Sequence, residues 1–106
     1  MKNKTFIGSI IITPSPLYCN NKDYYALSVL GQWEIETGEN FVITDKCLFS
    51  LIYGKKSFNI TKNGIVKVKK GAKLGDRGLI QAIYKDSKGQ YMNDQIDVIY
   101  DVEYCD

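Results

Sequence analysis

The stretch from residue 95 to residue 105 alternates between apolar and polar side chains with a period of two. Every second position is apolar or aromatic, and three of the positions between them are the acids Asp97, Asp101 and Glu103. Successive side chains of a β-strand point to opposite faces, whereas a helix repeats about every 3.6 residues. We therefore predict a long antiparallel strand with one face in a core and an acidic face in solvent.

The rest of the chain also favours strands over helices. Eight Tyr, four Phe and one Trp accompany many Ile and Val residues, and such side chains pack well on a pleated surface. No long stretch has the apolar spacing of an amphipathic helix. The chain has 106 residues and no linker, internal repeat or low-complexity tract. It therefore predicts one all-β domain that covers residues 1–106.

About seven short strands separated by turn signals predict an antiparallel β-sandwich. Besides the C-terminal strand, the expected strands cover residues 6–13, 24–36 as one or two strands with a bend or bulge at Gly31, 41–44, 47–53, 57–60, 65–69 and 79–84. Residues 17–23 are expected to form a polar turn. Segment 47–53 is apolar on both faces, which is typical of a central strand covered on both sides. The expected core includes Phe49, Ile60, Val66, Val68, Ile80, Ala82, Val98 and Tyr100.

The dipeptide Asn63-Gly64 predicts a tight hairpin between two of these strands. Both residues accept the positive φ that a type I′ turn requires. After the turn, alternate positions divide into a core-facing pair of valines, Val66 and Val68, and a solvent-facing pair of lysines, Lys67 and Lys69.

The hairpin belongs to a basic stretch, because residues 55–73 carry seven lysines and no acid. Residues 94–106 carry five acids and no base. A basic hairpin attracts phosphates, so the candidate polyanion-binding residues are Lys55, Lys56, Lys62, Lys67, Lys69 and Lys70. The favoured alternative is a solvated outer face. The net charge is only +2, and no Arg is present in the stretch to read a base with two hydrogen bonds. The sequence therefore does not favour nucleic acid as a partner.

Aromatic residues offer a second candidate surface. Trp33 together with Tyr24 or Tyr25 is a candidate glycan-stacking site, and packing in the core and its rim is the alternative. Glu34 and Glu36 follow Trp33 on one face of the same strand and resemble a glycosidase carboxylate pair. A chain of this size rarely provides the deep cleft that such an enzyme needs. We predict no enzymatic activity.

Metal and cofactor chemistry is not predicted either. The chain has no His, which is the commonest general base and metal ligand. Cys19, Cys47 and Cys105 are far apart in sequence and form no Cys-x-x-Cys pair. We expect no catalytic residue, no metal site and no cofactor. Buried thiols are the favoured state of the cysteines, and one long-range disulfide with a spare thiol is the alternative.

Several short motifs follow one another in a characteristic order: Phe49-Ser50, Ile60, Asn63-Gly64, Val66-x-Val68, a glycine-rich loop at 71–78, and Ile80-x-Ala82-x-Tyr84. In this order and spacing, residues 47–104 resemble the bacterial immunoglobulin-like domains of group 2 type. These are the intimin- and invasin-like repeats, and similar modules occur in phage structural proteins. Two features depart from the family: Phe49 replaces its usual core Trp, and residues 24–41 do not align with its N-terminal strands.

The resemblance implies an immunoglobulin-like sandwich that serves as a noncatalytic structural or adhesive module of a bacterial surface protein or a phage particle. Its partners would be other domains of that assembly, and weak binding of surface carbohydrate is a further expectation. The N-terminus does not read as a signal peptide, and no segment approaches the roughly 20 apolar residues of a membrane span. The alternative is a free-standing cytoplasmic β protein that binds nucleic acid or an intracellular protein through the basic hairpin at 55–73.

Overall fold

The computed structural model describes residues 7–33, 40–86 and 88–104, and these residues form strands almost throughout. The single helical element among them is a three-residue 3₁₀ turn, η1 (Thr44–Lys46). The strands are β1 (Ile7–Thr13), β2 (Leu17–Asn20), β3 (Tyr25–Ala26), β4 (Ser28–Trp33), β5 (Asn40–Val42), β6 (Cys47–Tyr53), β7 (Phe58–Ile60), β8 (Ile65–Val68), β9 (Arg77–Lys85) and β10 (Tyr91–Val102). The predicted all-β class is confirmed.

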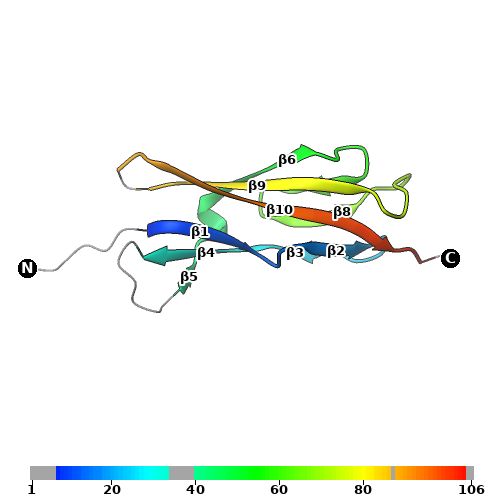
Figure 1. Ribbon diagram of the computed structural model, residues 1–106, viewed down its shortest axis with the longest axis horizontal. Helices are drawn as coiled ribbons and strands as arrows, with labels where there is room; N and C mark the ends of the chain where they lie inside the picture. Colours follow the sequence, from blue (N-terminus) through cyan, green and yellow to red (C-terminus); the bar gives the residue numbers. More distant parts are fainter. Residues whose placement is uncertain (1–6, 34–39, 87, 105–106) are drawn as a thin grey trace, which may run out of the picture.

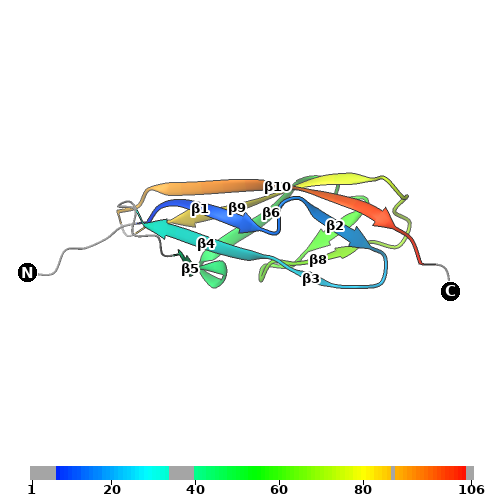
Figure 2. The same ribbon diagram turned by 60° about the horizontal axis from the view of Figure 1, so that its bottom comes forward.

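The strands form two layers, as in a β-sandwich (Figures 1 and 2). One layer is a four-stranded sheet with the order β2-β10-β9-β6. The other consists of two three-stranded sheets, β1-β4-β5 and β3-β8-β7. These two sheets adjoin because β3 and β4 belong to one extended run that is interrupted only at Leu27. The described residues thus contain ten strands, more than the expected seven, partly because two extended runs are each divided.

The first extended run crosses from one layer to the other. β1 pairs antiparallel with β4, and after the two prolines at positions 14 and 16 the chain continues as β2, which pairs parallel with β10. The predicted turn at 17–23 is therefore wrong over Leu17–Asn20. The strand forms because Leu17 and Cys19 enter the core at alternate positions. The backbone nitrogen of Asn20 donates to Tyr25 Oη at 2.8 Å, which satisfies a buried polar group at the end of the strand.

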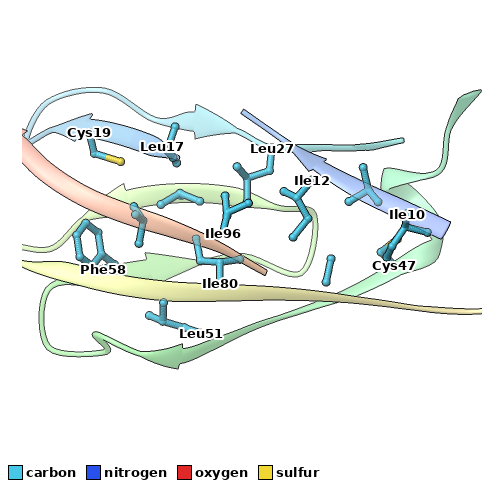
Figure 3. Close-up of a cluster of buried hydrophobic side chains, with 14 of the residues drawn as sticks. Ile10, Ile12, Leu17, Cys19, Leu27, Cys47, Leu51, Phe58, Ile80 and Ile96 are labelled. Carbon is cyan, nitrogen blue, oxygen red and sulfur yellow. The ribbon is translucent and has the colours of Figure 1, made fainter. Parts of the chain in front are cut away.

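A single apolar cluster fills the space between the layers (Figure 3). Six of the eight expected core residues are buried, whereas Phe49 and Ile60 are only partly buried against the cluster. Two aromatic side chains of the cluster are fully buried, Phe58 and Tyr100, each 1% exposed. Phe49, which was expected in the core, instead packs against the cluster and is only partly buried. Phe49 lies on the same face of β6 as the buried Cys47 and Leu51, so its side chain points towards the core. It is less buried because β6 is the edge strand of its sheet.

The position of β6 is the main departure from the predicted arrangement. Among the described strands it pairs with β9 alone and forms the edge of its sheet, so the prediction of a central strand covered on both sides is wrong. Leu48, Ile52 and Tyr53 are 71%, 48% and 50% exposed. An irregularity in the pairing between Leu51 and Tyr53 adds one residue to β6 there. β6 therefore exposes several large apolar side chains to solvent.

Smaller differences concern β10 and Gly31. β10 begins at Tyr91, before the predicted start, and Val102 and Tyr104 at its C-terminal side are exposed although they continue the apolar alternation. The alternation therefore continues beyond the buried part of the strand, and Tyr104 packs against Lys22 instead of the core. Gly31 lies in regular pairing with Ile10 and Phe41 rather than at the predicted bend or bulge.

Candidate interaction surface on the lysine-rich hairpin

The predicted hairpin is present as β7 and β8, joined by a turn at residues 61–64. The Gly64 nitrogen donates to Thr61 O at 3.0 Å, and the Thr61 nitrogen donates to Ile65 O at 2.9 Å. Gly64 has φ +84°, but no other residue in the turn has positive φ. Type I′ needs positive φ at both central residues, so the predicted turn type is wrong. The turn instead ends in a left-handed glycine, as in longer hairpin loops.

Strand register brings one candidate lysine beside one candidate aromatic residue. Because Tyr25 pairs with Val66 and Asn59 pairs with Lys67, the outer face carries Tyr24, Lys67 and Asn59 in a row across three strands. Lys67 Nζ donates to Tyr24 Oη at 3.1 Å and lies 4.6 Å from the centre of the Tyr24 ring. An ammonium group over an aromatic face is an attractive arrangement. Lys67 thus holds Tyr24 against the sheet.

A second lysine of the hairpin is also engaged within the fold. Lys69 Nζ donates to the carbonyl oxygen of Lys55 at 2.9 Å, and the Lys69 nitrogen donates to Ser57 O at 2.7 Å. These contacts tie the end of β8 to the turn between β6 and β7. Lys67 and Lys69 therefore have structural partners within the fold, and the candidate residues Lys55, Lys56, Lys62 and Lys70 are exposed.

Two grooves lie along the end of β8. One, of about 310 Å³, is lined by Asn59 and residues 67–70. The other, of about 270 Å³, is lined by Asn21, residues 67–72, Tyr100 and Glu103. The acidic end of β10 thus comes into the same groove as the lysines, so the basic and acidic stretches of the sequence meet at one end of the molecule. This proximity reduces the attraction of the hairpin for a polyanion.

The loop that carries Lys70 and Lys73 is fixed by a carboxylate. Ser57 Oγ donates to Asp76 Oδ2 at 2.6 Å, and the Lys73 nitrogen donates to the same oxygen at 2.9 Å. The bond from Ser57, followed by the bond from the Lys73 backbone, lowers the pKa of Asp76 below its ordinary value. Asp76 also accepts a backbone bond from Tyr100 at 2.9 Å, so the loop is held against β10.

The three aromatic residues of the candidate glycan site do not form one surface. Trp33 ends β4, eight residues after Tyr25 along one extended run, so roughly 26 Å separates their backbones at about 3.3 Å per residue. Tyr24 is 66% exposed, whereas Tyr25 is half-buried with its hydroxyl on Asn20. Glu34 and Glu36 lie outside the described residues. Tyr24 offers an exposed ring beside Lys67 of the hairpin.

The described cysteines are buried thiols. Cys19 and Cys47 are free, and Cys105 lies outside the described residues. Burial, with a contribution from Asp101, raises the pKa of Cys19 from 9.0 to about 12. Burial, with a contribution from Asp45, raises the pKa of Cys47 to about 11. Both thiols stay protonated near neutral pH and are poor nucleophiles.

Within residues 7–33, 40–86 and 88–104, no group of three or more Cys, Asp or Glu side chains is arranged to hold a metal ion. The only helical residues described are the three of η1, so no helix there could span a bilayer.

Sequence reasoning missed the surface around β6. The exposed Leu48 and Tyr53 pair with Ile83 and Leu79 of β9, both half-buried, so the apolar area continues onto the next strand. A run without charge or proline is the usual signature of a buried strand, so nothing in the sequence marked it as an edge.

Comparison with known proteins identifies no family for this chain: no family model matches it, and no curated protein sequence is significantly similar to it.

Proposed function

We propose that this chain is a noncatalytic immunoglobulin-like β-sandwich module that serves as an in-line structural unit of a bacterial surface protein or a phage particle. The strand order supports the fold assignment. One layer contains β6, β9 and β10 side by side, and the other contains β1 with β4 and β8 with β7. Constant-type immunoglobulin domains have a sheet of four strands facing a sheet of three. If β3 and β4 count as one strand, then β1, β4, β8 and β7 correspond to the four, and β6, β9 and β10 correspond to the three. In this assignment β2 is an extra strand in the sheet of three, and β5 is an extra strand in the sheet of four.

The observation that carries the functional proposal is the parallel pairing of β2 with β10 in an elongated molecule. The molecule measures 61 × 24 × 17 Å. β1 begins toward one end of the long axis and β10 finishes toward the other (Figures 1 and 2). A load on the two ends pulls the β1–β2 run and β10 past each other along their length. The hydrogen bonds between β2 and β10 then resist together rather than one after another.

The same two runs share a second link. The backbone nitrogen of Ile12 in β1 donates to Asp94 Oδ2 in β10 at 2.8 Å. This bond lies across the two layers, before the chain reaches β2. Together, the two links join the first and last strands over most of the length of β10. Such an arrangement suits a module that keeps its neighbouring domains at a fixed separation or carries tension between them.

The in-line arrangement can be tested with tandem fusions of two and three copies studied by small-angle X-ray scattering. If the copies follow one another along the long axis, each added copy lengthens the maximum dimension by about 61 Å. A single copy with the same linker sets the baseline. An increment near the 24 Å width of the molecule would contradict the proposal, because the copies would then lie side by side.

A further inference from the structure

The free edge of β6 differs from the other surfaces of the sandwich. Residues 47–53 carry no charge, no proline and no glycine. Edge strands usually carry such residues, because an open row of backbone donors and acceptors invites pairing with another chain. On its free side β6 has no hydrogen-bonded partner among the described strands. The bulge near Ile52 interrupts the strand at one end only, so residues 47–51 keep regular pairing geometry.

A groove of about 350 Å³ lies beside this edge. Phe49 and Leu51 of β6 form one wall, and Phe58 and Ile60 of β7 form part of the other. β7 is itself the edge of its sheet, so the groove runs between the open sides of the two layers. An added strand beside β6 would place alternate side chains over this groove. The others would extend the exposed apolar face at Leu48.

The charges around the groove indicate what kind of strand would fit. Lys55 and Lys69 line it, and the bond from Lys69 Nζ to Lys55 O holds that ammonium group there. Both walls belong to the stretch from residue 46 to residue 75, which has no acidic residue. An incoming strand with carboxylates would therefore meet cations and no repulsion within the groove.

We propose that the β6 edge is a strand-addition site for an extended segment of a partner polypeptide in which apolar and acidic residues alternate. The backbone of the segment pairs with residues 47–51. Its apolar side chains continue the surface of Leu48, and its carboxylates face Lys55 and Lys69. This site is independent of the in-line structural role, since it uses the side of the molecule rather than its ends.

The probe is an acetylated and amidated octapeptide of alternating valine and glutamate, labelled for fluorescence anisotropy, with a valine–lysine octapeptide as its counterpart. The valine–glutamate peptide should bind and slow amide hydrogen exchange at residues 47–51. Leu48→Glu should weaken binding about tenfold or more, because it removes the apolar contact at this position and places a charge beside the valine side chains of the peptide. Val42→Glu is the matched control: Val42 is 65% exposed on the edge strand β5, and this change should leave binding unaltered.

Lys55→Gln should weaken the same binding about twofold to fivefold, the range for one exposed ion pair. Lys62→Gln, at the hairpin tip outside the groove, should have no effect. Any of four results would overturn the proposal: no binding at about 1 mM peptide, equal binding of the valine–lysine peptide, equal binding by the Leu48→Glu variant, or no protection of residues 47–51. Self-association of the chain in ultracentrifugation that Leu48→Glu abolishes would also overturn it, because a second copy would then be the occupant.

Discussion

Asp94 of β10 accepts a hydrogen bond from the backbone nitrogen of Ile12 at 2.8 Å, and this bond joins the two layers at the side of β1 that faces away from β4. Ile12 is buried, and on this side of β1 no described strand forms hydrogen bonds with it. Removing the acceptor leaves that nitrogen without a partner. A bond to a charged group contributes about 1.5–3 kcal/mol.

Asp94→Ala should therefore lower the free energy of unfolding by about 1.5–3 kcal/mol in urea titrations. Asp97→Ala is the matched control, because Asp97 is exposed on the same strand, and a surface change of this kind usually stays within about 0.5 kcal/mol. Equal losses for the two variants would show that the Asp94 bond contributes nothing specific.

The two phenylalanines near the groove should differ in their contribution to stability. Phe58 is fully buried and Phe49 is only partly buried. Phe58→Ala should cost about 3–5 kcal/mol, the usual range for truncating a buried aromatic residue, and Phe49→Ala should cost less, since its side chain is only partly buried. Chemical denaturation of both variants tests this order. A larger loss for Phe49→Ala than for Phe58→Ala would contradict this difference in burial.

Gly64 is constrained both by its backbone and by a neighbouring ring. It has φ +84°, and a Cβ there would lie 3.0 Å from Phe49 Cζ. Gly71 has a similar φ of +97°, but a Cβ at that position would meet no atom within 4 Å. Gly71→Ala should thus cost only the backbone strain of about 1 kcal/mol. Gly64→Ala should cost more, because Phe49 must also move. Equal unfolding free energies for the two variants would contradict the close packing of the turn on Phe49.

The buried thiols should make stability fall at alkaline pH. The pKa of Cys19 is about 12 in the folded protein and 9.0 when unfolded, so above pH 9 the unfolded chain binds fewer protons than the folded one. Stability that is fully present below pH 9 is then lost as the pH rises toward 12, with a limiting slope of about 1.4 kcal/mol per pH unit for one thiol. Cys47, with a pKa of about 11, adds to the loss over a narrower range.

Cys19→Ala in a Cys105→Ser background isolates the effect of the first thiol. The variant is expected to be less stable than its parent at pH 8, because a cavity replaces the sulfur, and the difference should shrink between pH 9 and 11. Urea titrations at several pH values measure both curves. Parallel curves would show that Cys19 titrates normally in the folded protein.

Local sequence patterns predicted most strands correctly, because period-two alternation and turn residues act over a few positions. The alternation at 79–84 and the hairpin around Gly64 depend only on neighbouring residues, and both are present as β9 and the β7–β8 turn. The long-range arrangement was not predictable in the same way. Segment 47–53 has the composition of a central strand, but its place at the sheet edge depends on which strands pair with β9.

The candidate site was predictable in its composition but not in its contacts. The lysines of residues 55–73 were evident, yet only the register of β3, β8 and β7 brings Tyr24 to Lys67. The same extended geometry separates Trp33 from both tyrosines. β2 was missed because two prolines precede it and polar residues follow, and its parallel pairing with β10 joins segments about eighty residues apart.

The measurement that tests the structural role most directly is single-molecule force spectroscopy with two anchor geometries. In the first, the chain is anchored at its two ends, so β2 and β10 are loaded along their length. In the second, the anchors are a cysteine placed at Lys22, in the Cys105→Ser background, and the C-terminal end. Lys22 follows β2 and stacks over Tyr104, so both anchors lie at the same end, and the pull separates β2 from β10 one bond at a time. We predict a clearly higher unfolding force for the end-to-end geometry at the same pulling speed. Equal forces in the two geometries, or a lower force end to end, would contradict the claim that this module is built to carry tension.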